Sequence, residues 1–320
     1  IKYFMLKLKA LLLTQGMHGM ISQVEGLAKA LGLSFRHETI QLKKFWNFFP
    51  PKFTPVTEGI LGKKFVCDSK VIISCGRKSV VPSILLKRRF KKEVFNIHIQ
   101  DPKVNLSNFD SIICPEHDNL HGENVIKTKG AIHYLTNHEI QKNINYLKPK
   151  EGEKKIVTFI IGGPNKYYSF SEKQIDKMFA KIKNMFISTK YKLIVIPSYR
   201  TPENIIKLAY NYFNQDHLVI KERDKKAYLS SLGLAQVIIV TCDSTSMISE
   251  AAITGKPVYV AQMSHKRSIQ RFEKFYKLFK DLGIIRNLED NIDHWTYKGL
   301  DEVNRAAALV KEKMKKNGII

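Results

Sequence analysis

Short apolar runs and amphipathic segments alternate along the whole chain, and each predicts a different element. Compact apolar runs predict buried strands, whereas apolar residues spaced three and four positions apart predict helices. In the first half, the predicted strands are 10–13, 35–40, 71–75, 94–99, 111–114 and 125–128. The predicted helices of this half are 20–31 and 80–89.

The second half repeats the pattern. Its predicted strands are 156–161, 193–196, 217–220, 237–241 and 258–261. Its predicted helices are 172–186, 202–213, 225–232, 246–254, 269–282 and 302–315. Strands that alternate with helices indicate βαβ units around a parallel sheet. Because the pattern runs twice, we predict an α/β protein with two Rossmann-like domains facing a central cleft, which the carboxyl ends of the strands line.

The polar stretch 146–155 separates the two halves. It contains charge, proline and glycine but no periodicity, which predicts a linker. We therefore expect a first domain at 1–147, a second at 154–300, and a C-terminal helix at 301–320 that packs back on the first domain. A second irregular segment, 46–55, is rich in aromatic residues and proline and predicts a loop or an irregular helix.

The composition narrows the class of protein. Of the 320 residues, 44% are apolar, which is enough for buried cores, yet no apolar run is long enough to span a bilayer. The apolar run 10–13 is too short for the core of a signal peptide, and we interpret it as a buried strand. The four cysteines have no paired spacing, which predicts buried free thiols and no metal site.

The chain is strongly basic. It has 53 Lys and Arg against 29 Asp and Glu, a net charge of +24, spread over both halves and densest at 87–92. Such a surface is either simply solvated or attracted to an anionic partner such as phospholipid or nucleotide. Because the charge is diffuse and no stacking motif or zinc knuckle accompanies it, we do not expect nucleic acid as a partner.

The segment 240–258 combines a strand end, a polar turn and a helix start. Asp243 and the serines beside it can cap this helix, whose free N–H groups suit a diphosphate. Glu250 follows Ser246 by four residues, on the same helix face, and its carboxylate can accept hydrogen bonds from ribose hydroxyls. A well-capped helix without a ligand is the alternative. The predicted donor-binding residues here are Asp243, Ser244, Ser246, Met247 and Glu250.

Two further strand ends extend this predicted phosphate site. Gly162 and Gly163 follow the first strand of the second domain and let the backbone approach a ligand closely, and Asn165 comes next. Ser198 and Arg200 end the following strand, where a guanidinium can bind phosphate. Ordinary turn formation explains the glycines equally well, and a surface arginine capping a turn explains Arg200.

Polar clusters also follow the strands of the first domain, and we expect them to line the site of a second substrate. The predicted acceptor-side residues are Gln15, Gly16, His18, Arg77, Lys78, Ser79 and Gln100. Two adjacent cations at a helix start, as at 77–78, are unfavourable without an anionic ligand. Asp101, Glu116 and His117 are the candidate catalytic bases, although each of them alone is also a common turn former.

Seven motifs in a fixed order connect these clusters. They are GRKS (76–79), IQDP (99–102), PEHD (115–118), GGP (162–164), PS (197–198), TCDSTSMISE (241–250) and WTY (295–297). Together they resemble the mitochondrial-fission family named after the plant "elongated mitochondria" protein, over nearly the whole chain. The first loop departs from it, since QGMHG (15–19) stands where members often have Asp-Gly-x-x-Gly.

That family is similar to the GT-B glycosyltransferases and to the nucleotide-sugar epimerases. The resemblance implies a GT-B-like fold whose second domain binds a nucleotide-sugar donor, with Glu250 on the ribose and the 243–246 turn at the diphosphate. It implies that the first domain binds the acceptor, a cell-envelope glycolipid or polysaccharide precursor, and supplies the base. A metal-independent glycosyltransferase without a cofactor is therefore expected.

Location and alternatives follow from the same considerations. We expect a cytoplasmic protein with a peripheral contact to the inner face of an anionic membrane, through the basic surface and the aromatic segment 46–53. Two other functions stay open: a non-catalytic adaptor, and an epimerase that acts on the free nucleotide sugar.

Overall fold

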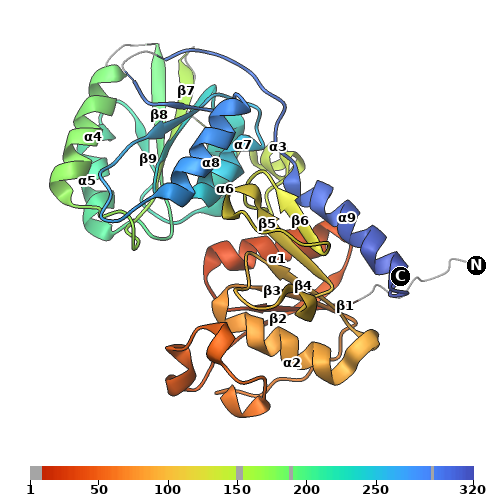
Figure 1. The fold of residues 1–320 in the computed structure, drawn as a ribbon. Helices are drawn as coiled ribbons and strands as arrows, with labels where there is room; N and C mark the ends of the chain where they lie inside the picture. The colour runs from red at the N-terminus through yellow and green to blue at the C-terminus, as the bar shows by residue number, and fades with distance from the viewer. Residues whose placement is uncertain (1–8, 149–153, 187–189, 290–291) are drawn as a thin grey trace, which may run out of the picture. The chain divides into compact units, whose positions relative to one another are not determined.

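The computed structural model describes residues 9–148, 154–186, 190–289 and 292–320 (Figure 1). The chain forms two compact units, one made of 1–134 together with 301–320, and the other of 135–300. Each unit contains one six-stranded parallel sheet with helices packed against it. The α/β fold with two Rossmann-like sheets, predicted from the alternating pattern, is confirmed.

The first unit has the strand order β2-β1-β3-β4-β5-β6. Its strands are β1 (Lys9–Thr14), β2 (Ser34–Thr39), β3 (Val71–Cys75), β4 (Phe95–Ile99), β5 (Ser111–Pro115) and β6 (Val125–Thr128). Its helices are α1 (His18–Ala30), α2 (Val80–Phe90) and α9 (Glu302–Lys316).

The alternation of side chains along β1 shows how the first core forms. Ala10 and Leu12 belong to the apolar cluster that includes residues of α1 and α9, whereas Leu11 and Leu13 belong to the cluster that includes Leu86 of α2. Successive side chains of a strand point to opposite faces of the sheet, so a strand covered on both faces has an unbroken apolar run. This explains why residues 10–13 are all apolar, with no polar residue between them.

The second unit has the strand order β12-β11-β10-β7-β8-β9. Its strands are β7 (Lys155–Ile161), β8 (Tyr191–Pro197), β9 (Leu218–Val219), β10 (Val237–Thr241), β11 (Val258–Ala261) and β12 (Ile285–Asn287). Its helices are α3 (Asn137–Asn143), α4 (Glu172–Met185), α5 (Glu203–Phe213), α6 (Lys225–Leu234), α7 (Thr245–Ala252) and α8 (Gln270–Asp281).

The border between the compact units differs from the predicted domain boundary at 147. Residues 135–147 lie with the second unit, because α3 packs against α6 and the Leu147 amide donates to Ser230 Oγ at 3.0 Å. Ser230 Oγ in turn donates to the carbonyl of Ile144 at 2.7 Å. Of the predicted linker, residues 149–153 lie outside the described part of the chain.

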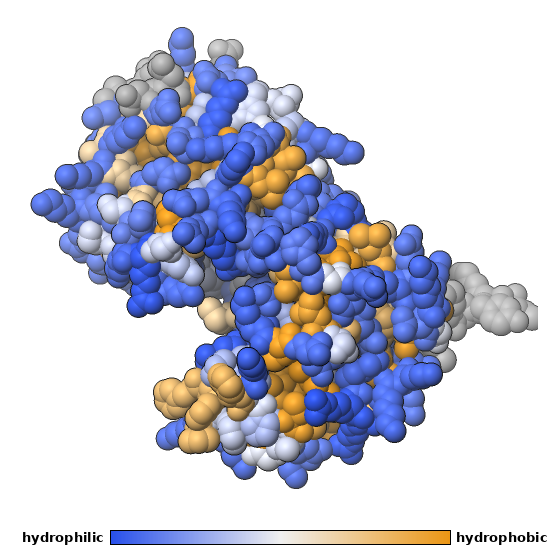
Figure 2. Space-filling view, in the orientation of Figure 1, coloured by the Kyte–Doolittle hydropathy of each residue, from blue (hydrophilic) through white to orange (hydrophobic). Residues whose placement is uncertain are grey.

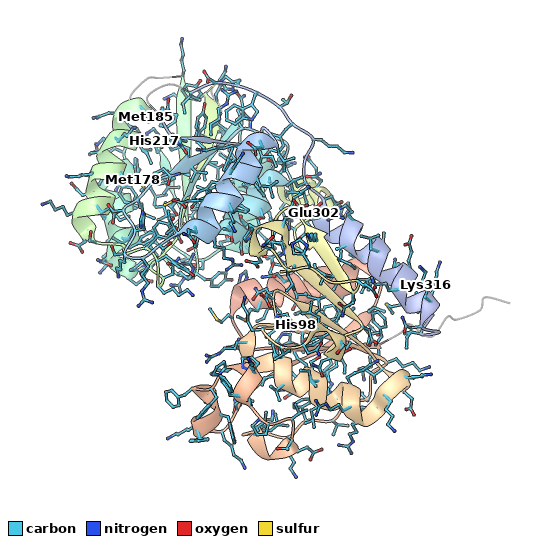
Figure 3. The ribbon with its side chains drawn as sticks, viewed as in Figure 1. His98, Met178, Met185, His217, Glu302 and Lys316 are labelled. Atoms are coloured by element: carbon cyan, nitrogen blue, oxygen red, sulfur yellow. The ribbon has the colours of Figure 1, made fainter. Side chains whose placement is uncertain are left out.

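The C-terminal helix α9 packs against α1 and β6 of the first unit. Its apolar face, made of Val303, Ala306, Ala307, Val310 and Met314, belongs to the same core cluster as α1. Glu302 at its start is labelled in Figure 3 and accepts a hydrogen bond from the backbone N–H of Lys129 at 2.7 Å. Among the described residues, no helix has both the length and the apolar character needed to cross a membrane.

Candidate functional site

The switch point of the second sheet lies between β7 and β10. The chain runs outward from β7 to β8 and β9 on one side, and then continues from β10 to β11 and β12 on the other. In an open parallel sheet the two loops at such a point diverge, and ligands bind between them at the carboxyl edge. Here these loops are the turn after β7, with Gly162 and Gly163, and the turn after β10, which begins α7.

Both glycines of the first turn are required by close packing. A Cβ on Gly162 would lie 2.1 Å from Asp243 Oδ1, and one on Gly163 would lie 2.0 Å from the carbonyl oxygen of Arg200. The Gly162 amide donates to Thr241 Oγ1 at 2.8 Å, which ties the two loops together. The glycines therefore allow three strand ends to meet at one place, which is a structural reason for the GGP motif.

The carboxylate of Asp243 is buried at the centre of this junction. It accepts hydrogen bonds from the Gly163 amide at 3.2 Å, from Thr241 Oγ1 at 2.6 Å and from Arg200 Nη2 at 2.6 Å. Burial raises the pKa of Asp243, and the adjacent Arg200 guanidinium acts against this shift. Arg200 also donates to the carbonyl of Gly163 at 2.6 Å. Arg200 and Asp243 thus form an ion pair that holds the turn.

Of the side chains expected to cap α7, a serine does so and Asp243 does not. The side chain that caps α7 is that of Ser244, whose Oγ accepts a hydrogen bond from the Met247 amide at 3.3 Å. The carboxylate of Asp243 points to the glycine turn instead. The first amides of a helix, here those of Thr245 and Ser246, have no partner within the helix. Together with the helix dipole they make its start suited to an anion.

Glu250 lies on α7 and is only partly exposed. Its carboxylate accepts a hydrogen bond from the hydroxyl of Tyr228 on α6 at 2.8 Å. Burial raises the pKa of Glu250 to about 7, against the smaller opposing effect of this hydrogen bond. The carboxylate therefore changes charge near neutral pH and keeps capacity for further hydrogen-bond donors.

Asn165 and Ser198, both predicted at the phosphate, hold their own turns. Asn165 Nδ2 donates to the carbonyl of Asp243 at 3.0 Å, and its Oδ1 accepts from the amides of Tyr167 and Tyr168. Ser198 Oγ lies 3.1 Å from Thr201 Oγ1. These side chains shape the rim of the junction.

Lys256 is a further structural residue that sequence reasoning did not single out. Its Nζ donates to the carbonyls of Leu232 and Gly233 at 2.8 and 2.6 Å, at the end of α6. Burial lowers the pKa of Lys256 to about 8. A lysine at a helix C-terminus satisfies carbonyls that lack helical partners, so it fixes α6 and with it Tyr228.

The first unit has an equivalent switch point, between β1 and β3. Gly76 after β3 has φ of +92°, and a Cβ there would lie 2.6 Å from both Gln15 Nε2 and Met20 Sδ. Gly16 has φ of +82°, and its amide donates to Thr14 Oγ1 at 3.0 Å. The sheet thus brings together the predicted acceptor-side loops at 15–18 and 76–79.

The side chains of these two loops have protein partners. Arg77 Nη2 donates to the carbonyl of Asn47 at 2.7 Å, and Ser79 Oγ donates to that of Gly76 at 2.8 Å. The His18 ring packs edge-on against Tyr134, with 6.2 Å between centroids. Lys78 lies beside Arg77 and lines a small cavity with it.

The candidate bases follow β4 and β5, farther along the same sheet. Asp101 forms an ion pair with Lys103 at 2.5 Å, and Glu116 forms one with Lys129 at 2.7 Å. The His117 side chain is buried, with Nε2 3.8 Å from Asp118 Oδ1. Their catalytic role stays a prediction.

Backbone strain marks the end of β4. Gln100 has φ of +85°, an unfavourable value for a residue with a side chain, and its amide donates to the carbonyl of Ile113 at 2.8 Å. His98, labelled in Figure 3, lies inside the sheet with Nδ1 2.9 Å from Ser74 Oγ. Burial lowers the pKa of His98 to about 3, so this ring stays neutral. Among the described residues, no group of three or more His, Cys, Asp or Glu can hold a metal ion.

Solved structures with the same architecture define the class of fold. The UDP-GlcNAc 2-epimerase of Methanocaldococcus jannaschii is 12% identical, with a TM-score of 0.54 over 95% of this chain and 99% of that one. The glycosyltransferase SnogD of Streptomyces nogalater is 11% identical, with a TM-score of 0.55 over 97% and 95%. The protein has the GT-B fold shared by these glycosyltransferases and epimerases.

Comparison of the amino-acid sequence with known proteins establishes the family. The model of the family described as "Mitochondrial fission ELM1" matches residues 18–314, and the chain belongs to this family. The mitochondrial fission protein ELM1 of Arabidopsis thaliana is 24% identical over 278 residues, which are 78% of this chain and 64% of that protein. The chain thus spans less than two thirds of the plant relative. The RP120 protein of Rickettsia prowazekii is 27% identical over 293 residues, 77% of this chain and 80% of that protein. The resemblance inferred from the seven motifs is confirmed.

Proposed function

We propose that the second unit binds a nucleotide sugar and that the protein transfers the glycosyl group to a cell-envelope glycolipid or glycan. The observation that carries this proposal is on α7, where a carboxylate at Glu250 lies one to two turns from the helix start at Thr245. Ribose hydroxyls donate to carboxylates, and diphosphates accept from helix-start amides. The M. jannaschii structure, an enzyme named for UDP-GlcNAc, has the same fold.

The proposed roles follow from the geometry. The amides and hydroxyls at 244–247 bind the diphosphate, and the glycine turn at 162–163 lets the backbone approach it. In glycosyl transfer, negative charge develops on the leaving diphosphate, and preorganised amides stabilise it without reorganisation. The Arg200–Asp243 pair positions the turn and leaves phosphate binding to the backbone.

The first unit is proposed to bind the acceptor through the loops at its switch point, with Asp101, Glu116 or His117 as the base. A general base must be within hydrogen-bond reach of the acceptor hydroxyl. The lysines paired with Asp101 and Glu116 compete for these carboxylates. An acceptor of this kind lies in a membrane, so the proposal includes a cytoplasmic protein in peripheral contact with anionic lipid.

The nucleotide site is tested by thermal denaturation with UDP, GDP, ADP, CMP and dTDP and their sugar conjugates, without metal. A ligand at 100 times its Kd adds about 2.7 kcal/mol, a shift of a few degrees. We expect a shift with one nucleotide family. A folded sample that responds to no nucleotide contradicts the proposal and favours a non-catalytic adaptor.

The role of Glu250 is tested by Glu250→Gln, read by calorimetry with the nucleotide sugar that the screen selects. Loss of a charge-assisted hydrogen bond is worth about 1.5–3 kcal/mol, so affinity should fall about 10- to 100-fold. Glu273→Gln, at an exposed position on α8, is the matched control and should leave the affinity unchanged. Equal affinities for Glu250→Gln and the control would exclude Glu250 from the site.

The pH dependence gives a second, independent test of this carboxylate. Donation from ribose favours the ionised form, and the pKa of Glu250 is about 7 in the free protein. The affinity for the nucleotide sugar should therefore rise about tenfold between pH 6 and 8 and level off above that. The phosphates of a nucleotide sugar do not titrate in this range, and Glu250→Gln should remove the slope. A slope that persists in the variant contradicts the assignment.

An epimerase is the second candidate, favoured by the structural match to UDP-GlcNAc 2-epimerase. It acts on the free nucleotide sugar, so it should convert the sugar with no acceptor present. Following the sugar nucleotide by NMR, alone and with envelope lipid extract, separates these functions. Conversion without acceptor identifies the epimerase, and release of nucleoside diphosphate only with acceptor identifies the transferase.

A further inference from the structure

An aromatic segment projects from the first unit between β2 and β3. Residues 42–53 contain two short 3₁₀ helices, η1 (Lys44–Asn47) and η2 (Pro51–Phe53). Phe45 is 61% exposed, Phe48 82% and Phe53 66%. Figure 2 shows apolar side chains gathered at this projection, at the lower left of the view. Three exposed phenylalanines within nine residues form an apolar patch of the kind that marks an interaction surface.

The projection is held in place by packing and hydrogen bonds. Phe45 packs against Trp46 and Phe49, with centroids 4.9 and 4.8 Å apart. The Lys43 amide donates to the carbonyl of Ile60 at 2.9 Å, and Arg77 donates to the carbonyl of Asn47. The exposed rings are therefore presented by an ordered support. This also gives Arg77 a role other than anion binding.

The charged residues of segment 42–53 are all basic. Residues 42–53 include three lysines, Lys43, Lys44 and Lys52, and no acidic residue. All three lysines are exposed. An anionic surface that also accepts aromatic rings complements this combination.

An apolar groove of about 250 Å³ lies on the same unit, between segment 58–66 and α2. Its apolar wall is formed by Leu61, Phe65, Val66, Leu85 and Leu86, and its charged rim by Glu58, Lys64 and Arg89. Val66 is 74% exposed at its mouth. Trp46 of the aromatic segment and Phe65 of the groove pack against one buried cluster, which includes Leu61. The groove and the projection therefore share a single support.

We propose that segment 42–66 is the surface by which the protein docks on an anionic phospholipid bilayer. Phe45, Phe48 and Phe53 enter the interfacial layer, and Lys43, Lys44 and Lys52 bind lipid phosphates. The groove receives an acyl chain beside Lys64 of its rim, where Glu58 and Arg89 form an ion pair. Aromatic rings and lysines are enriched together where proteins meet the headgroup region. This inference rests on the lipid contact of the proposed function and assigns a surface to it, whereas the nucleotide-binding tests above do not depend on it.

Co-sedimentation of the full chain with vesicles tests the docking. The vesicles are phosphatidylcholine alone, or phosphatidylcholine with phosphatidylglycerol. We expect binding to the mixed vesicles and at least about tenfold weaker binding to the neutral ones. A folded chain that sediments with neither vesicle overturns the proposal and assigns the patch to a protein partner.

Two variants separate the contributions of rings and charges. Phe45→Ser/Phe48→Ser/Phe53→Ser and Lys43→Gln/Lys44→Gln/Lys52→Gln should each weaken binding to the mixed vesicles about 100-fold. The matched control Lys173→Gln/Lys177→Gln/Lys274→Gln removes the same charge from exposed positions on α4 and α8. It should weaken binding less than about threefold. Equal losses in the two lysine variants mean attraction by net charge alone and overturn the assigned surface.

The two tryptophans of the chain report where lipid contacts the protein. Trp46 lies in the proposed surface, and Trp295 lies in the second unit, where its Nε1 donates to the carbonyl of Gly283. Trp295→Phe leaves Trp46 as the sole reporter, and Trp46→Phe leaves Trp295. Vesicles with brominated acyl chains should quench Trp46 and spare Trp295. Quenching of Trp295 alone, or of neither in a bound sample, overturns the proposal.

Discussion

Replacing Gly163 by alanine is expected to destabilise the second unit by about 3 kcal/mol or more. The new Cβ would lie 2.0 Å from the carbonyl oxygen and 2.3 Å from the carbonyl carbon of Arg200. A backbone neighbour cannot move aside as the end of a side chain does. Relief of the clash therefore requires the turns after β7 and β8 to separate, which also breaks the bond from Arg200 to the Gly163 carbonyl.

The measurement is thermal and urea denaturation followed by circular dichroism. A loss of this size lowers the Tm of the second unit by roughly 5–10 °C. Gly19→Ala is the matched control, because a Cβ there meets nothing within 4 Å and Gly19 lies inside α1. Alanine is the better helix former, so the control should be neutral or slightly stabilising. Equal stability of the two variants would show that the turn after β7 is not packed as described.

Replacing Asp243 by alanine should cost about 3–4 kcal/mol of the free energy of unfolding. Its carboxylate is fully buried and serves three donors: the Gly163 amide, Thr241 and Arg200. Removing it leaves those donors unsatisfied and the Arg200 guanidinium without its anion. The Arg200 side chain is 36% exposed, so water hydrates the guanidinium and offsets part of the lost ion pair.

A second variant removes part of this network. Asp243→Asn keeps one acceptor oxygen, which can serve the Gly163 amide, but it places an NH2 group toward Thr241 and removes the charge that faces Arg200. It should cost about 2 kcal/mol, less than Asp243→Ala. Asp281→Ala is the control, since the exposed pair of Asp281 with Lys277 on α8 contributes at most about 0.5 kcal/mol. The free energies of unfolding of the three variants are measured by urea denaturation. A cost for Asp243→Ala no larger than that of the control would contradict the buried network.

The sequence predicted most elements because their signals are local. Strands buried on both faces, such as 71–75 and 237–241, have unbroken apolar runs, and their bounds agree with β3 and β10. Segment 46–55 was expected as a loop or irregular helix, and η1 and η2 lie in or beside it. The element β12 was missed, since it has three residues of which one is buried.

The missed helix α3 had a signal that could have found it. Thr136 caps the helix by accepting from the Glu139 amide at 3.2 Å. A threonine followed three residues later by glutamate is the pattern of a capping box. Only Ile140 of this helix is buried, so the apolar periodicity was too weak to show it. The expected boundary at 147 came from the polar stretch 146–155, whereas the compact units divide after 134.

The side-chain partners at the candidate site could not be predicted from local pattern. Arg200 and Asp243 are 43 residues apart, and only the sheet order places their strand ends together. A turn arginine and a helix-start aspartate each suggested a ligand when considered alone. For Glu250, the local pattern was sufficient to predict its place on a helix, and the residue lies on α7. Its hydrogen-bond partner Tyr228 could not be predicted in this way, because it comes from α6.

The return of α9 to the first unit has a consequence for synthesis on the ribosome. Residues 135–300 form the second unit, so they are made before the 301–320 segment that completes the first. Until α9 emerges, the apolar face of α1 that packs with Val303, Ala306 and Val310 lacks its cover. The later-made unit can thus finish folding before the earlier-made one. The nascent chain must keep an open apolar surface from aggregating while residues 135–300 are being translated.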